Sequence, residues 1–126
     1  MRRSGRDTIV VLDTNILISY LWSSANCIRI IRALLVEDRF TAAVSREMME
    51  EFDDVVSRPK VKRIIGEIDP AIFRREYLLS TLLVQPKKSV NICDDPNDNI
   101  LLDCAEESDA DFLVTGDQDL LRLSRF

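Results

Sequence analysis

Acidic side chains recur in this sequence where the chain should leave a buried strand. Asp13 directly follows the apolar stretch Thr8–Leu12, and Asp117 follows a second one, Phe112–Val114, after a turn at Gly116. An acid at the end of a buried strand is costly to desolvate unless a helix N-terminus or a cation compensates its charge. Taken singly, Asp13 fits a helix N-cap equally well and Asp117 fits a plain turn. The same arrangement at two strand ends favours a shared site.

A third acid, Asp98, is placed by helical spacing. Apolar residues follow it three, four and seven positions later, so its carboxylate should point along the buried face of the helix. Asp95 and Pro96 fit the N-cap and the first helical position, which puts Asp98 in the first turn. The helix dipole favours a negative charge there, but it does not require an acid that faces inward.

The helix expected after Ser45 offers several acids: Glu47, Glu50, Glu51 and Asp54. Most of these carboxylates should be solvated surface. At about 100° per residue, Glu51 lies nearest the edge of the apolar stripe and Glu50 lies opposite it. Glu51 is therefore the acid of this helix that is best placed to reach inward.

The composition restricts what such acids can do. Histidine is absent, which excludes Ser/His and Cys/His nucleophilic triads and imidazole-based zinc sites. The three cysteines are an odd number without a CxxC pair, so they indicate neither a disulfide framework nor a metal cluster. Converging carboxylates make an all-oxygen site that suits Mg²⁺ or Mn²⁺. Such sites are best suited to phosphate-ester hydrolysis, in which one ion activates a water and another, about 3.5–4 Å away, stabilises the leaving oxygen.

Short apolar runs alternate with amphipathic segments, which predicts an α/β fold. The strands are expected at Thr8–Leu12, Phe40–Val44, near Val84–Pro86 or Val90–Ile92, and at Phe112–Val114. The helices are expected at Asn15–Trp22, Cys27–Val36 with Asn26 as its cap, Ser45–Arg58, Lys60–Ile65, Ala71–Leu83 and Pro96–Ser108. This order predicts a three-layer α/β/α sandwich with a mainly parallel central sheet of about four strands. In such sheets, sites form at the carboxyl ends of the strands.

The whole chain fits one domain. It has 126 residues, 46% of them hydrophobic and 31% charged, and residues 1–7 are expected to form a flexible N-terminal arm. No apolar run approaches the ~20 residues of a membrane helix, and the N-terminus lacks a signal-peptide core, so we expect a cytoplasmic protein. The net charge of −5 argues against broad adhesion to nucleic acid, but it is compatible with an acidic pocket for a divalent cation.

Four segments, in order along the chain, resemble the motifs of the PIN-domain family of metal-dependent ribonucleases, especially the single-domain prokaryotic toxins of toxin–antitoxin pairs. These segments are Val11–Ser19, Val44–Phe52, Asp94–Ala105 and Leu113–Leu120. Each motif alone is weak, whereas four in this order are specific. The resemblance implies that catalysis and metal binding fall to Asp13, Glu51, Asp98 and Asp117, supported by Thr14, Asn15, Thr115 and Asp119. Glu47 is the alternative to Glu51 in the second motif.

The resemblance also implies an activity and partners. The expected activity is Mg²⁺- or Mn²⁺-dependent cleavage of single-stranded RNA, and the expected partners are an antitoxin protein and further copies of the chain in a homodimer or higher oligomer. A basic run could contact the RNA backbone, although such charges are more often solvated surface: Arg58, Lys60, Lys62 and Arg63. Trp22 and the stripe of Ile28, Ile31 and Leu35 could meet a protein partner, although such stripes are more often core.

Other classes fit less well. A haloacid-dehalogenase-like phosphohydrolase wants Asp-x-Asp after its first strand, and the second position here is Asn15. A receiver domain needs a late lysine where this chain has Thr115. A degenerate PIN-like fold that binds RNA or protein without cutting is the strongest rival. Members of the family usually continue into another strand beyond the fourth motif, whereas this sequence stops at Phe126. We therefore expect the sheet to lack that edge strand.

Overall fold

The central sheet is parallel throughout its four strands. The computed structural model describes residues 8–87 and 95–115. The strands are β1 (Ile9–Leu12), β2 (Thr41–Ser45), β3 (Thr81–Val84) and β4 (Phe112–Val114), in the spatial order β3-β2-β1-β4. Every pair of neighbours is parallel, with Val11 opposite both Ala43 and Leu113. The carboxyl ends of β1 and β4 therefore lie side by side.

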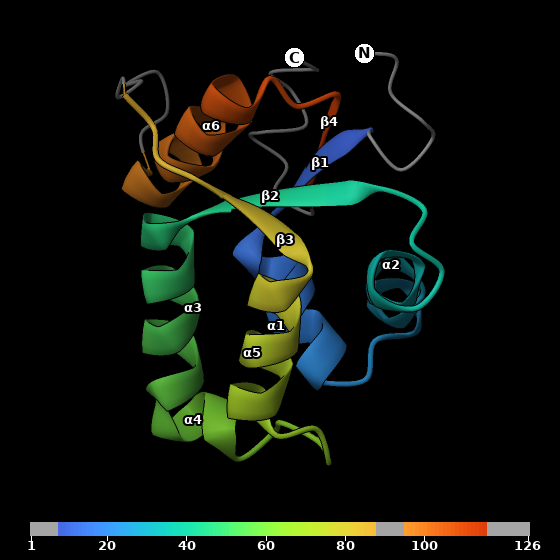
Figure 1. Ribbon diagram of the computed structural model, residues 1–126. Helices are drawn as coiled ribbons and strands as arrows, with labels where there is room; N and C mark the ends of the chain where they lie inside the picture. Colours follow the sequence, from blue (N-terminus) through green and yellow to red (C-terminus); the bar gives the residue numbers. More distant parts are fainter. Residues whose placement is uncertain (1–7, 88–94, 116–126) are drawn as a thin grey trace.

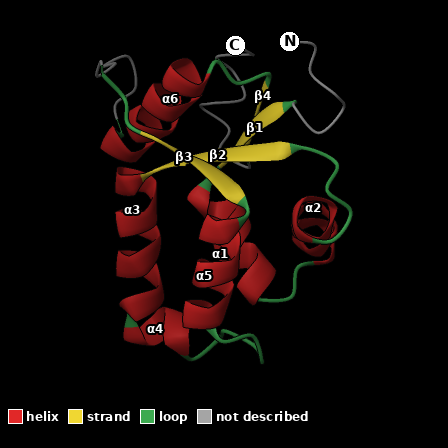
Figure 2. Cartoon of the chain, in the orientation of Figure 1, coloured by secondary structure: helices red, strands yellow, loops and turns green. Residues whose placement is uncertain are grey.

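Helices cover both faces of this sheet, as Figure 1 shows. They are α1 (Thr14–Leu21), α2 (Ala25–Leu35), α3 (Arg46–Ser57), α4 (Pro59–Lys62), α5 (Pro70–Leu79) and α6 (Pro96–Ser108). In the view of Figures 1 and 2, α6 lies above the sheet, and α1, α2, α3 and α5 lie below it. This arrangement confirms the predicted α/β/α sandwich with a parallel sheet of four strands.

The core forms where the two inner strands meet these helices. Val11, Leu12 and the β2 segment Ala42–Val44 are fully buried, because helices pack on both faces of the sheet. The two outer strands are less covered, and Leu83 of β3 and Phe112 of β4 are 64% and 61% exposed. The most deeply buried part of the sheet is therefore the β1–β2 pair, and β1 leads directly to Asp13.

Short polar side chains fix where the helices begin. The Ser45 hydroxyl accepts a hydrogen bond from the Met48 N–H at 3.3 Å and starts α3. Asp69 and Asp95 cap α5 and α6, and each is followed by a proline at the first helical position. The predicted cap and first residue of α6 are thereby confirmed, and Asp98 lies in the first turn as expected.

Two predictions of local structure were wrong. The helix predicted over Ala71–Leu83 ends at Leu79, and Thr81–Val84 forms β3 instead. A short apolar run looks the same in a strand and in a buried helix, and here pairing with β2 decides the outcome. The cap of α2 is also not Asn26, because the helix begins at Ala25 and Ser24 takes the cap position without a side-chain hydrogen bond.

The remaining elements begin and end within a few residues of their predicted bounds. The expected N-terminal arm and the alternative strand at Val90–Ile92 lie outside the described residues. None of the helices in the described part of the chain is long and apolar enough to cross a membrane.

Candidate active site

Asp13 joins the end of β1 to the end of β4. Its side chain is 5% exposed, and its Oδ1 accepts a hydrogen bond from the Asn15 N–H at 3.0 Å, which caps α1. The other oxygen, Oδ2, accepts a hydrogen bond from the Thr115 hydroxyl at 2.5 Å. The backbone N–H of Asp13 also donates to the Val114 carbonyl at 2.9 Å. Asp13 is thus a helix cap and, at the same time, the contact between the predicted first and fourth motifs.

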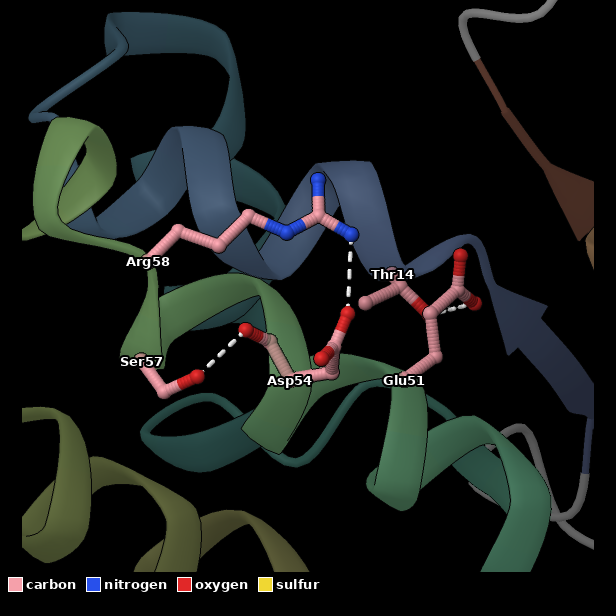
Figure 3. A network of polar contacts seen from close by, with 5 residues as sticks. All are labelled: Thr14, Glu51, Asp54, Ser57 and Arg58. Carbon is pink, nitrogen blue, oxygen red and sulfur yellow. Dashed lines mark hydrogen bonds and ion pairs between the residues drawn. The ribbon is translucent and has the colours of Figure 1, made fainter.

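The next residue, Thr14, joins the first motif to the second. Thr14 is 2% exposed, and its hydroxyl donates to Oε1 of Glu51 at 3.0 Å. Figure 3 shows the two side chains meeting between α1 and α3. Glu47 lies one turn earlier on α3, is exposed, and lines a separate cavity of about 200 Å³ next to β3. Of the two glutamates that the sequence offered, the structure therefore brings Glu51 to the first motif.

Asp98 lies on the buried face of α6, as its spacing predicts. Asp98 is only 6% exposed, and Leu101, Leu102 and Ala105 on the same face are each 2% exposed. Its N–H donates to the carbonyl of Asp95 at 3.0 Å within the first turn. The helix cap and the packing of α6 against β1 and β2 thus hold this acid inside the fold.

Burial and the charges of neighbouring acids both act on Glu51. Burial raises the pKa of Glu51 above the ordinary value of 4.5, and the negative charges of Asp13, Asp95 and Asp98 raise it further, while the Thr14 hydrogen bond opposes the shift. Within the described residues, the polar partners of Asp13 and Glu51 are two hydroxyls and a backbone N–H rather than a lysine or arginine. Within the described residues, neither Asp13 nor Glu51 is therefore neutralised by an ion pair.

The donor set fits a hard divalent cation. Asp13, Glu51 and Asp98 offer only oxygen atoms, and their mutual repulsion is what a bound cation would relieve. Within residues 8–87 and 95–115, however, no three acidic or cysteine side chains already stand together as a metal cluster. Asp117 and Asp119, the remaining predicted acids, lie outside the described residues. Asp13, Glu51 and Asp98 are the described residues that would hold the ion.

The other predicted residues divide into two groups. Thr115 is half-buried and bonds to Asp13, whereas the side chain of Asn15 is exposed. The basic run, Arg58 through Arg63, lies at the end of α3 and along α4, and its four cations are exposed. The structure thus brings Thr14 and Thr115 to the acids and leaves the basic run outside them.

Asp95 is an acid near the site that was predicted only as a helix cap. Asp95 caps α6 through the Asn97 N–H at 2.9 Å, yet its charge also raises the pKa of Glu51. The signal was present in the sequence, because three acids fall within the five residues Asp94–Asp98 at the start of one helix.

A parallel α/β fold with acids gathered at the carboxyl ends of its strands is typical of metal-assisted phosphoesterases and nucleases. The chain belongs to the PIN domain family, whose sequence profile matches residues 9–119. This match confirms the resemblance of the four motifs, and it places the chain in a superfamily of hydrolytic nucleases that typically use divalent metals.

A curated relative agrees with this assignment over most of the chain. An uncharacterized protein of Methanocaldococcus jannaschii is 28% identical over 115 residues, which cover 90% of this chain and 74% of the relative. No solved structure matches the chain.

Proposed function

We propose that this protein is a Mg²⁺- or Mn²⁺-dependent endoribonuclease that hydrolyses phosphodiester bonds of single-stranded RNA. The observation that carries the proposal is the pair of hydrogen bonds from Thr115 to Asp13 and from Thr14 to Glu51. These two bonds join three segments that are far apart in the sequence. Asp98 enters the same region from α6, close enough for its charge to act on Glu51.

Each of these residues has a distinct part in the proposed site. Asp13, Glu51 and Asp98 supply carboxylate oxygens for the cation, and Asp117 is proposed as a fourth acid from the family resemblance. The hydroxyls of Thr14 and Thr115 each hold one carboxylate oxygen, which fixes how the acids present their other oxygens. A divalent cation in such a site supplies a water of lowered pKa and positive charge for the leaving oxygen.

A cation in the site should strengthen substrate binding as well as support the chemistry. The negative charges of three carboxylates repel a phosphodiester, which is itself an anion. Further positive charge is proposed to come from Arg58, Lys60, Lys62 and Arg63, which are exposed beside α3. Binding of RNA should therefore depend on both the metal ion and the salt concentration.

The direct test is cleavage of a single-stranded RNA by purified protein with Mg²⁺ or Mn²⁺. Asp13→Asn and Asp98→Asn should each abolish cleavage, because each removes a negatively charged oxygen donor at nearly constant volume. Glu50→Gln is the matched control, since Glu50 is exposed on the same helix as Glu51 and lies outside the acid cluster. Circular dichroism should show that all three variants stay folded.

The nuclease proposal would be overturned if the wild-type protein cleaved RNA as fast in EDTA as with Mg²⁺ or Mn²⁺. Wild-type cleavage rates in both Asp13→Asn and Asp98→Asn would also overturn it. A second candidate is a PIN-like module that binds RNA or protein without cutting. It predicts RNA binding with no cleavage under any divalent metal. The same assay therefore separates the two functions.

We further propose that the protein is the toxin of a toxin–antitoxin pair in the cytoplasm, inhibited by an antitoxin protein and active as a homodimer or higher oligomer. This proposal is supported by the resemblance to single-domain prokaryotic toxins. The apolar stripe suggested for such partners is divided in the structure, because Ile31 is 1% exposed while Ile28 and Trp22 are 37% and 43% exposed. Only the exposed part of the stripe is available to a partner.

The toxin role predicts a cellular effect. Induced expression of the wild-type chain in a bacterial host should arrest growth, and Asp98→Asn at the same protein level should not, because the arrest would require RNA cleavage. Colony counts after induction measure the effect. Unchanged growth with soluble wild-type protein present would contradict the toxin role without touching the nuclease proposal.

A further inference from the structure

Two helices lead away from the acids in the same direction. At the near end, Thr14 at the start of α1 bonds to Glu51 of α3. At the far end, the Gly66 N–H donates to the carbonyl of Leu21, the last residue of α1, at 3.0 Å. Gly66 and Ser57, the last residue of α3, line the same cavity, so the far ends of α1 and α3 also lie near one another. Figure 1 shows both helices descending from the sheet.

On α3, the face that carries Glu51 continues to an arginine. Asp54 and Arg58 follow Glu51 by three and seven residues, which places all three on one side of the helix. The Arg58 guanidinium bonds to Asp54 at 2.8 Å, and Figure 3 shows it reaching back over Asp54 towards Glu51 and Thr14. A cation is therefore held beside Asp54, on the side of α3 that carries Glu51.

This cation is available to a stronger partner. The side chains of Arg58 and Asp54 are 59% and 68% exposed, so water screens their ion pair. A guanidinium has five N–H donors, and the bond to Asp54 occupies one of them. Arg58 can thus contact a phosphate while keeping its place over α3.

Lys62, another cation of the basic run, is less well placed for this role. Lys62 lines a cavity of about 660 Å³ between α3 and α5, together with Asp53 and Arg74. Arg74 makes two hydrogen bonds to Asp53, at 2.7 and 3.0 Å, which marks this flank of α3 as the one that faces α5. Lys62 therefore lies on a different flank of α3 from Glu51 and Arg58.

On α1, the exposed face leads to a tryptophan. Asn15, Ser19 and Trp22 are spaced by four and three residues and so share one side of the helix. Trp22 ends α1 and is 43% exposed, whereas Leu21 beside it is fully buried. At a rise of about 1.5 Å per residue, Trp22 lies about 10 Å along α1 from Asn15. It is the only tryptophan of the chain.

We propose that Arg58 and Trp22 form a track for the substrate strand beside the acids, with Arg58 contacting a phosphate and the Trp22 ring stacking on an unpaired base. The identity of the ligand as RNA rests on the proposed function. Stacking on a side chain requires a base that is free of its own duplex stack, so the track selects single strands. A cation followed by an exposed aromatic ring is the combination that binds single strands without reading their sequence.

The single tryptophan allows a direct test. The full chain is titrated in EDTA, which prevents cleavage, with a single-stranded RNA of twelve nucleotides, and the Trp22 emission is recorded. The single strand should quench the emission saturably, and the same RNA annealed to its complement should not. Binding of labelled RNA, measured by anisotropy, then provides affinities for variants that lack the tryptophan.

The expected losses differ between the two residues. Trp22→Ala should weaken binding about ten-fold, while Trp22→Phe, which keeps a ring, should recover most of the affinity. Arg58→Gln should weaken binding and reduce the slope of log affinity against log salt by about 0.7. Ile72→Ala and Arg75→Gln are matched controls, because they remove an exposed apolar side chain and an exposed cation from α5. Both controls should bind as the wild type does.

Several outcomes would overturn the track. Wild-type affinity in both Trp22→Ala and Arg58→Gln would do so, as would equal quenching by duplex RNA. An emission shift that follows protein concentration instead of RNA would place Trp22 in contact with a second copy of the chain and would also overturn it. Failure of the proposed nuclease looks different, because the strand would then quench Trp22 and bind, yet no divalent metal would support cleavage.

Discussion

Glu51 shows how one residue of the site is subject to opposing forces. Burial and three neighbouring acids disfavour its ionised form, while the hydrogen bond from Thr14 favours it. The balance raises the pKa, so the folded protein binds a proton at Glu51 more readily than the unfolded chain does. Carboxylates held in this way are destabilising when they are ionised, and a bound cation offsets that cost.

The raised pKa predicts how stability depends on pH in the absence of metal. The contribution of Glu51 is fully present below pH 4.5, the ordinary value, and is lost as the pH rises through the higher pKa of the folded state. Glu51→Gln keeps an oxygen that accepts from Thr14 but cannot ionise, so its stability should fall less over this range. Urea unfolding in EDTA at a series of pH values measures the difference. Parallel curves for the two proteins would contradict the shift.

At the scale of elements, two residues at the start of α6, three positions apart, have different roles. Asp95 caps the helix, and Asp98 follows in its first turn on the buried face. The dipole of α6 favours negative charge at this end, which lowers the cost of placing two acids there. The helix that closes one face of the sheet is therefore also the helix that delivers an acid to the site.

Two substitutions at Asp95 separate its roles. Asp95→Ala removes the cap and should lower the free energy of unfolding by about 1 kcal/mol. Asp95→Asn keeps a capping oxygen while removing the charge, so stability should be close to that of the wild type and the pKa of Glu51 should fall. Urea unfolding gives the first result, and the pH series described for Glu51 gives the second. Equal destabilisation by both substitutions would show that the charge, rather than the cap, supports α6.

At the scale of the whole molecule, the strand order determines which motifs meet. β1 lies between β2 and β4, so the residues that follow β1 lie next to the residues that follow β4 and next to α3, which follows β2. The first, second and fourth motifs are thereby gathered at one edge of the sheet. α6, which carries the third, packs against β1 and β2.

The acids of the proposed site come from the end of a strand and from helices on both faces of the sheet. Occupation by a metal ion should therefore stabilise the entire domain. Mn²⁺ at a hundred times its dissociation constant should add about 2.7 kcal/mol to the free energy of unfolding and raise Tm by several degrees. Asp98→Asn should lose this effect on both quantities, because it removes a charged oxygen donor from the proposed ion site. Thermal melting with and without Mn²⁺ tests both statements. An equal rise in Tm for the variant would place the ion elsewhere.

Much of the fold could be predicted from local pattern, and the larger of the two errors arose where a distant contact decides the structure. The start of α6 at Pro96 and the strand Phe112–Val114 follow from signals within a few residues. The end of α5 at Leu79 does not, because Thr81–Val84 becomes a strand only by pairing with β2, which is distant in the sequence. Helical spacing favoured Glu51 over Glu47, but only the contact with Thr14 shows that Glu51 meets the first motif.

The sequence by itself determined the kind of chemistry available, because the absence of histidine and the positions of the acids after strands and in first turns are matters of residue type and spacing. It also determined the alternation of strands and helices, which local periodicity encodes. Only the tertiary structure decided that Thr115 bonds to Asp13 and that Thr14 bonds to Glu51. Such contacts join residues remote in the chain, and they depend on strand order and helix packing that no local pattern specifies.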